Sequence, residues 1–229
     1  MGLLGGRPVV EFGETGQAGR IEELAADAEA AGPLPLWEGY AAVENYPYPV
    51  RDATRSSDGV RIDRGMGNFF AYLVEETAPE TVLEIGAAFG VSGMYWLAGL
   101  TASGRGELVT FEPNGAWAAV ARQNLAAIGS RFRLVAGTFE ENLEAALPRS
   151  RRIDIAFIDG IHTAAAIEGQ FALLAPRMRP DGLVLFDDTD FSPEMTSSWR
   201  AIATSERVAA SALLAGRVGI VELSGQTLA

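Results

Sequence analysis

The chain has 229 residues, of which 48% are hydrophobic and 21% charged, as expected for a globular protein of one domain or one large α/β unit. It has no cysteine, all 18 basic residues are arginine, and His162 is the single histidine, which excludes thiol nucleophiles, disulfides, Schiff-base lysines, P-loop lysines and multi-histidine metal sites. The net charge of −12 argues against nucleic acid or an anionic membrane as a partner, because phosphate groups require a basic surface.

The amino-terminal segment lacks a basic region followed by an apolar stretch, so no signal peptide is predicted. The sequence contains no run of about 18 apolar residues, so no membrane-spanning helix is predicted. We therefore expect a cytoplasmic protein. The lysine-free, alanine-rich composition favours a bacterial genome of high GC content.

Short apolar runs alternate with amphipathic segments from about Arg61 onwards. In chain order, we predict helix 21–31, an irregular stretch 34–59, helix 67–77, strand 81–85, helix 92–100, strand 107–111, helix 113–128, strand 133–136, helix 140–147, strand 153–158, helix 163–178, strand 183–186, helix 194–204, and strands 208–214 and 218–223. Strands separated by helices indicate parallel βαβ units, whereas the last two strands have no helix between them and indicate an antiparallel pair at one edge.

The predicted fold class is therefore α/β, with a doubly wound Rossmann-like sheet, mostly parallel with an antiparallel edge strand, and helices on both faces. Residues 1–60 are expected to form an N-terminal helical and lid-like extension, and residues 61–229 the main domain. The stretch from Trp37 to Tyr48, together with Met66, Phe69 and Phe70, could form an aromatic lid or simply pack against the core.

Ligands of open α/β sheets bind beyond the carboxyl ends of the strands, so the residues that follow each strand are the candidates for a site. After strand 81–85 the sequence LEIGAAFGVSG has Glu84 at the strand end, Gly86 and Gly90 in the turn, and Ser92 opening a helix. Glycines let the backbone approach a ligand, and a helix N-terminus offers free N–H groups to an anion. The Gly-x-x-x-Gly spacing differs from that of dinucleotide binders, which disfavours an NAD-dependent oxidoreductase; a tight turn without a ligand is the alternative.

Acidic residues also follow the next two strands. Glu112 ends strand 107–111, where a carboxylate can accept both hydroxyls of a ribose, although it could equally cap the helix expected at Pro113. Thr138, Phe139 and Glu140 follow strand 133–136, where an adenine could be stacked and its amino group accepted. Glu140 would also suit the first turn of a helix.

Three aspartates lie at the ends of the next two strands, Asp159 after strand 153–158 and Asp187 with Asp188 after strand 183–186. Adjacent parallel strands lie about 4.8 Å apart, so the three carboxylates should converge on one rim. Protonation, pairing with arginine or a bound cation would relieve their repulsion, and oxygen ligands favour a hard cation such as Mg²⁺. Helix caps within a surface charge cluster are the alternative.

From about Gly65 to the C-terminus, these motifs resemble those of class I S-adenosylmethionine-dependent methyltransferases, especially the magnesium-dependent O-methyltransferases of the catechol, caffeoyl-CoA and macrolide-sugar types. The resemblance implies S-adenosylmethionine as the cofactor, and Mg²⁺ held by Asp159, Asp187 and Asp188. The implied cofactor contacts, from the methionine end to the adenine end, are Glu84, Gly86, Ser92, Glu112, Phe139 and Glu140.

The base is where this sequence departs from the catechol type, which has a catalytic lysine three residues after the first metal aspartate. His162 stands there instead, as in a DGxH variant of bacterial relatives. An imidazole with a pKa of about 6.5 can take a proton at neutral pH, and Asp159 could do so in its place; His162 could also be a half-exposed residue at a helix end.

The expected reaction is O-methylation of a small hydroxylated acceptor, phenolic or sugar-like, assisted by Mg²⁺. The alternatives are a metal-independent methyltransferase and a catalytically silent cofactor-binding protein of the same fold. The N-terminal extension is compatible with a homodimer.

Overall fold

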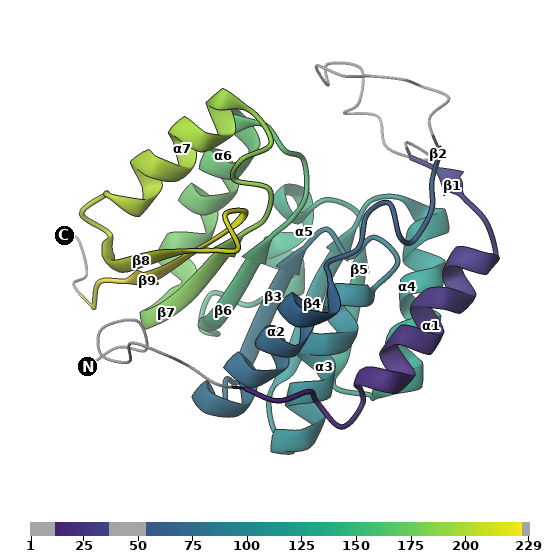
Figure 1. Ribbon diagram of the computed structural model, residues 1–229. Coiled ribbons are helices and arrows are strands. Elements are labelled where there is room, and N and C mark those ends of the chain that lie inside the picture. Colours follow the sequence, from purple (N-terminus) through teal and green to yellow (C-terminus); the bar gives the residue numbers. More distant parts are fainter. Residues whose placement is uncertain (1–11, 37–53, 226–229) are drawn as a thin grey trace.

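The computed structural model describes residues 12–36 and 54–225, and a seven-stranded sheet of order β5-β4-β3-β6-β7-β9-β8 forms its centre (Figure 1). Strands β5, β4, β3, β6 and β7 pair in parallel, whereas β9 runs antiparallel to both of its neighbours. The strands of the sheet are β3 (Thr81–Ile85), β4 (Glu107–Glu112), β5 (Phe132–Ala136), β6 (Ile153–Ile158), β7 (Met178–Phe186), β8 (Val208–Leu214) and β9 (Val218–Leu223). The predicted fold class is confirmed.

Helices cover both faces of this sheet (Figure 1). They are α1 (Ala18–Ala30), α2 (Arg64–Thr77), α3 (Val91–Ser103), α4 (Gly115–Ile128), α5 (Phe139–Ala146), α6 (Ala164–Leu174) and α7 (Pro193–Ala203), and two short strands, β1 (Leu34–Pro35) and β2 (Thr54–Arg55), pair beside them. Because successive strand residues point to opposite faces, Val82 packs in the core of α1–α4 and Leu83 in the core of α5–α7. Burial on both faces explains why the central strands β3 and β6 are mainly apolar. No helix in the described ranges is long and apolar enough to cross a membrane.

Several predicted boundaries are wrong. Helices α1 and α2 begin three residues before their predicted starts, at Ala18 and Arg64. Pro113 does not begin α4; Asn114 caps this helix by accepting from the N–H groups of Ala116 and Trp117, and the helix starts at Gly115. The helix expected to end at 178 ends at Leu174, and β7 begins at Met178. The strand predicted at 183–186 is thus longer at its start, and its pairing with β6 shifts register within β7 between Met178 and Leu183.

Helix α1 is part of the main core, because Ile21 and Ala25 are fully buried in the same cluster as α2 and α3. The hydroxyl of Tyr95 in α3 donates a hydrogen bond to Glu22 at 2.8 Å. The expected boundary between residues 60 and 61 stays a prediction.

The structure describes only part of the predicted aromatic lid. The stretch from Trp37 to Tyr48 lies outside the described residues. Phe70 is a core residue that stacks on Trp96, with 4.1 Å between the ring centroids, and Phe69 and Met66 pack against the same core. These three side chains therefore follow the packing alternative.

Candidate active site

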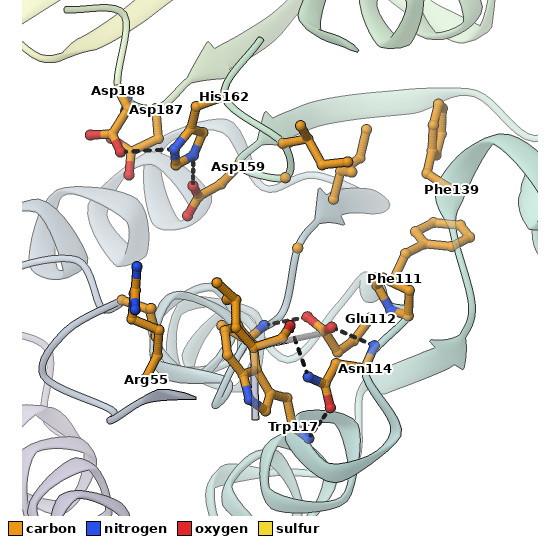
Figure 2. Close-up of a pocket in the computed structure, with 18 of the residues that line it drawn as sticks. Arg55, Phe111, Glu112, Asn114, Trp117, Phe139, Asp159, His162, Asp187 and Asp188 are labelled. Carbon is orange, nitrogen blue, oxygen red and sulfur yellow. Dashed lines mark hydrogen bonds and ion pairs between the residues drawn. The ribbon is translucent and has the colours of Figure 1, made fainter. Parts of the chain in front are cut away.

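A cavity of about 510 Å³ opens along the carboxyl ends of β3, β4, β5, β6 and β7, at the edge where ligands bind in open α/β sheets (Figure 2). Most of the residues predicted from the strand ends line it together, which confirms that the turns converge although they are far apart in the chain. They are Gly86, Glu112, Thr138, Phe139, Glu140, Asp159, His162, Asp187 and Asp188.

The other three predicted residues lie behind this cavity. Ser92 lines a small hollow that shares Gly86 and Asp159 with the cavity, and Gly90 lines neither space. Glu84 is fully buried inside β3, where one carboxylate oxygen accepts a hydrogen bond from the Thr110 hydroxyl at 2.6 Å. Glu84 therefore does not line the cavity and bonds to Thr110 of the neighbouring strand β4. Its role toward the cofactor stays a prediction.

Gly86 has a function in the structure that differs from the expected approach to a ligand. Its φ of +94° is in the left-handed region, and a Cβ atom there would lie 2.0 Å from the carbonyl oxygen of Asp159. The glycine thus allows the turn after β3 to touch the turn after β6. This contact brings Asp159 to the same cavity as the turn after β3.

Substituting Glu84 by glutamine is expected to stabilise the apo protein at pH 8 and to have little effect near pH 4.5. Burial, opposed by hydrogen bonds from Thr110 and Ser92, raises the pKa of Glu84 from 4.5 to about 7. The wild-type protein therefore loses stability as the pH rises from the unfolded pKa to the folded one, by roughly 3 kcal/mol for a shift of this size, whereas an amide does not titrate. Urea unfolding across this pH range measures the difference, and the exposed Glu141→Gln is the matched control. Parallel pH curves for wild type and Glu84→Gln would contradict the expectation.

Glu112 is a buried carboxylate at the end of β4. Its two oxygens accept hydrogen bonds from the backbone N–H groups of Ala88 and Asn114, each at 2.8 Å (Figure 2). Burial raises its pKa to about 7 although these two bonds oppose the change. Because Asn114 caps α4, Glu112 is not needed as the cap, and each of its oxygens keeps a lone pair for a donor in the cavity.

The turn after β5 forms one wall of the cavity. Thr138 caps α5 by accepting from the N–H of Glu141, and the Phe139 ring packs edge-on against Phe111 with centroids 5.5 Å apart. Glu140 accepts a hydrogen bond from the side-chain nitrogen of Gln170 at 2.8 Å. The helix start at this turn was predicted as one alternative, whereas the Phe139–Phe111 and Gln170–Glu140 contacts were not predicted, and the adenine role stays a prediction.

Gln170, in the middle of α6, was not predicted. It is 4% exposed, lines the cavity, and has no hydrogen-bond partner for its Oε1 among the described residues. Because a carboxylate can only accept, Glu140 must face the amide nitrogen of Gln170, which leaves Oε1 for a ligand that donates. An unpaired buried acceptor of this kind requires a partner.

His162 lies at the opposite end of the cavity from Glu112 (Figure 2). Its Nε2 is 3.2 Å from Asp159 Oδ1, and its Nδ1 is 3.2 Å from Asp188 Oδ2. Burial by itself would lower the pKa of His162, but the hydrogen bond to Asp159 and the charges of both aspartates raise it. Burial, aided by the charge of Asp187, raises the pKa of Asp159 to about 6.

Arg217, between β8 and β9, completes this end of the cavity and was also missed by the sequence analysis. Its Nε and Nη2 contact the two oxygens of Asp187 at 2.9 and 2.6 Å, and its Nε is 2.7 Å from Asp188 Oδ1. The helix-cap alternative for the aspartates is excluded, because Thr163 caps α6 and Ser192 caps α7.

The residues at this end do not fit the predicted Mg²⁺ site. Within the ranges that the structure describes, no three histidine or acidic side chains are arranged so that they could hold one metal ion. The guanidinium of Arg217 contacts both Asp187 and Asp188, so it occupies the oxygens that a cation would need. Of the three expected remedies for carboxylate repulsion, the structure contains arginine pairing.

Comparison with known proteins identifies the central part of the chain. Residues 83–189, which contain the turns after β3, β4, β5, β6 and β7, match the family profile described as a methyltransferase domain. This segment, just under half of the chain, is similar to a methyltransferase domain. The match supports the resemblance of the motifs to methyltransferases. Arg217 lies outside the matched residues of the methyltransferase domain. No curated protein sequence matches the chain significantly.

Solved methyltransferases share the fold over nearly the whole chain. An O-methyltransferase from Bacillus cereus, in complex with SAH, is 20% identical with a TM-score of 0.63 and covers 89% of this chain and 90% of its own. The O-methyltransferase TomG of Streptomyces achromogenes, involved in tomaymycin synthesis and in complex with SAM, is 15% identical with a TM-score of 0.63 and covers 94% and 93%. The SAH-bound methyltransferase PaMTH1 of Podospora anserina is 17% identical with a TM-score of 0.60 and covers 96% and 100%. Similarity at these identities establishes the methyltransferase fold.

Proposed function

We propose that the protein transfers a methyl group from S-adenosylmethionine to a hydroxyl oxygen of a small phenolic or sugar-like acceptor. One observation carries the proposal: a single cavity joins Glu112 and Gln170, which suit a nucleoside, to the His162–Asp159 pair, which suits proton removal. Its volume of about 510 Å³ is in the range of small-molecule sites.

The nucleoside end supports S-adenosylmethionine as the cofactor. The Glu112 carboxylate can accept one further hydrogen bond on each oxygen, as the two hydroxyls of a ribose require. The unpaired Oε1 of Gln170 suits the amino group of an adenine. When bound, S-adenosylmethionine supplies a methyl group on a positively charged sulfur. The solved B. cereus and S. achromogenes enzymes hold SAH and SAM, respectively.

The other end supports an oxygen acceptor. Asp159 at Nε2 and Asp188 at Nδ1 hold the orientation of the His162 ring, so an acceptor hydroxyl must replace Asp188 Oδ2 at Nδ1 to give its proton to that atom. The surrounding carboxylates stabilise the imidazolium that results, as the aspartate does in other His–Asp pairs. An alcohol must lose its proton to become a good nucleophile, which is why a base next to the cavity favours hydroxyl methylation. The proton passes to His162, with Asp159 as the orienting partner.

Titration calorimetry with SAH and with NAD⁺ tests the cofactor. We expect SAH to bind and NAD⁺ not to bind, because Gly86 and Gly90 are spaced differently from a dinucleotide fingerprint. Transfer of a labelled methyl group to a panel of catechols, phenols and sugars tests the reaction. Binding of NAD⁺ without SAH would overturn the proposal. Binding of SAH without transfer to any of these acceptors would favour the silent cofactor-binding alternative.

A further inference from the structure

We propose that Arg217 takes the place of a divalent cation in this site, so that methyl transfer by this chain needs no metal ion. The inference rests on the proposed function for its catalytic meaning. Its structural content is independent of that function, because it concerns how the three aspartates are neutralised. Arg217 is in this view a positioning residue, which acts through Asp187 and Asp188.

The carboxylate oxygens are already occupied by nitrogen atoms of the protein. Arg217 contacts both oxygens of Asp187 and Oδ1 of Asp188, and His162 contacts Oδ2 of Asp188 and Oδ1 of Asp159. Five of the six oxygens of the three aspartates thus have a nitrogen within 3.2 Å. A cation bound to these oxygens would have to displace a guanidinium that pairs with Asp187 bidentately, which is the strongest geometry of an arginine–carboxylate pair.

Burial makes this pairing necessary. Asp187 is 2% exposed, and an ionised carboxylate in such a place is costly unless it is paired and hydrogen-bonded. The single positive charge of Arg217 lies between Asp187 and Asp188, whose repulsion would otherwise oppose folding. No lysine exists in the chain to supply another cation.

The position of Arg217 is fixed by the backbone. Ala215 and Gly216 have φ values of 50° and 74°, so they form a two-residue hairpin turn that ends at Arg217. The carbonyl oxygen of Arg217 accepts hydrogen bonds from the N–H and the hydroxyl of Thr189, at 3.0 and 2.7 Å. Because Thr189 directly follows Asp188, the hairpin is tied to the segment whose carboxylates Arg217 pairs with.

Metal binding to the apo protein tests this inference. Mn²⁺ titrations monitored by electron paramagnetic resonance should detect no saturable site in wild type. Arg217→Met keeps the approximate length of the side chain and removes its charge. This variant should bind Mn²⁺ with an affinity at least about tenfold above the upper limit measured for wild type, because its three carboxylates are left with His162 alone. Arg105→Met is the matched control, since Arg105 pairs with Glu80 at an exposed site, and it should behave as wild type.

Thermal unfolding gives a second readout. Arg217→Met should unfold at a lower temperature than wild type without metal, and Mn²⁺ should restore part of the loss only in this variant. If Arg217→Met does not fold, Arg217→Lys keeps one charge without the bidentate contact and should bind Mn²⁺ more tightly than wild type does. A saturable Mn²⁺ site in wild type, or equal affinities in wild type and the folded Arg217 variant, would overturn the inference.

The two proposals fail in distinguishable ways. The Mn²⁺ measurements use neither SAH nor an acceptor, so absence of methyl transfer leaves their result unaffected. A wild-type protein that transfers methyl groups but stops in EDTA, and recovers on addition of Mg²⁺, would overturn the metal-free inference while supporting the proposed function.

Discussion

Replacing His162 by alanine is expected to lower the rate of methyl transfer about 10²–10⁴-fold, the usual contribution of a positioned general base. The imidazole is the single histidine of the chain, and Asp159 holds it through Nε2 at 3.2 Å. Its removal leaves no other imidazole to accept the acceptor proton. Since His162 lies at the opposite end of the cavity from Glu112 (Figure 2), the affinity for SAH should stay within about threefold of wild type. Steady-state kinetics and calorimetry measure the two quantities.

The same variant decides between the two candidate bases. If His162 is the base, added imidazole should restore part of the activity of His162→Ala but none of the activity lost in Asp159→Asn, where the ring is still present. If Asp159 is the base, Asp159→Asn should be the more damaging change and imidazole should restore nothing. Turnover of His162→Ala equal to that of wild type would remove His162 from the reaction.

Replacing Glu112 by glutamine is expected to weaken SAH binding by about 100-fold or more. Hydrogen bonds to a charged group contribute about 1.5–3 kcal/mol each, and about 1.4 kcal/mol corresponds to a tenfold change in affinity. The amide turns one acceptor oxygen into a donor, so it loses a ribose contact. The new amide group also faces a backbone N–H, that of Ala88 or that of Asn114, which in wild type donates to the oxygen that the amide nitrogen replaces.

Calorimetry with SAH measures this loss, and the far-ultraviolet circular dichroism of the variant shows whether it keeps the secondary structure of wild type. Glu141→Gln serves as the control, because Glu141 lies in the adjoining helix α5 without lining the cavity. An affinity of Glu112→Gln within about threefold of wild type would show that Glu112 does not hold the cofactor.

Local sequence determined the elements and the rim of the site. The predicted bounds of β3, β6, β8 and β9 match the structure. β3, β6 and β9 are buried on both faces and are mainly apolar runs bounded by glycine or polar residues, whereas β8 is an edge strand whose residues alternate between half-buried and exposed. The residues that follow parallel strands must reach the same edge of a sheet. Gly86, Glu112, Asp159 and His162 were therefore placed together without knowledge of any contact, and they line one cavity.

Tertiary structure alone decided the contacts between these groups and the rest of the chain. Glu84 alternates with Leu83 and Ile85, but both faces of β3 are apolar. The sequence pattern therefore could not predict that the Glu84 side chain faces α3 at Gly93. Gln170 reaches the cavity from the middle of a helix that has no polar signature.

Arg217 reaches Asp187 only because β9 inserts between β7 and β8, a non-local pairing that brings the hairpin turn beside the end of β7. Spacing along the chain determines strands and turns, whereas the order of strands in a sheet depends on packing between distant segments. The sequence by itself predicted that three carboxylates converge. Only the fold determined that an arginine pairs with two of them.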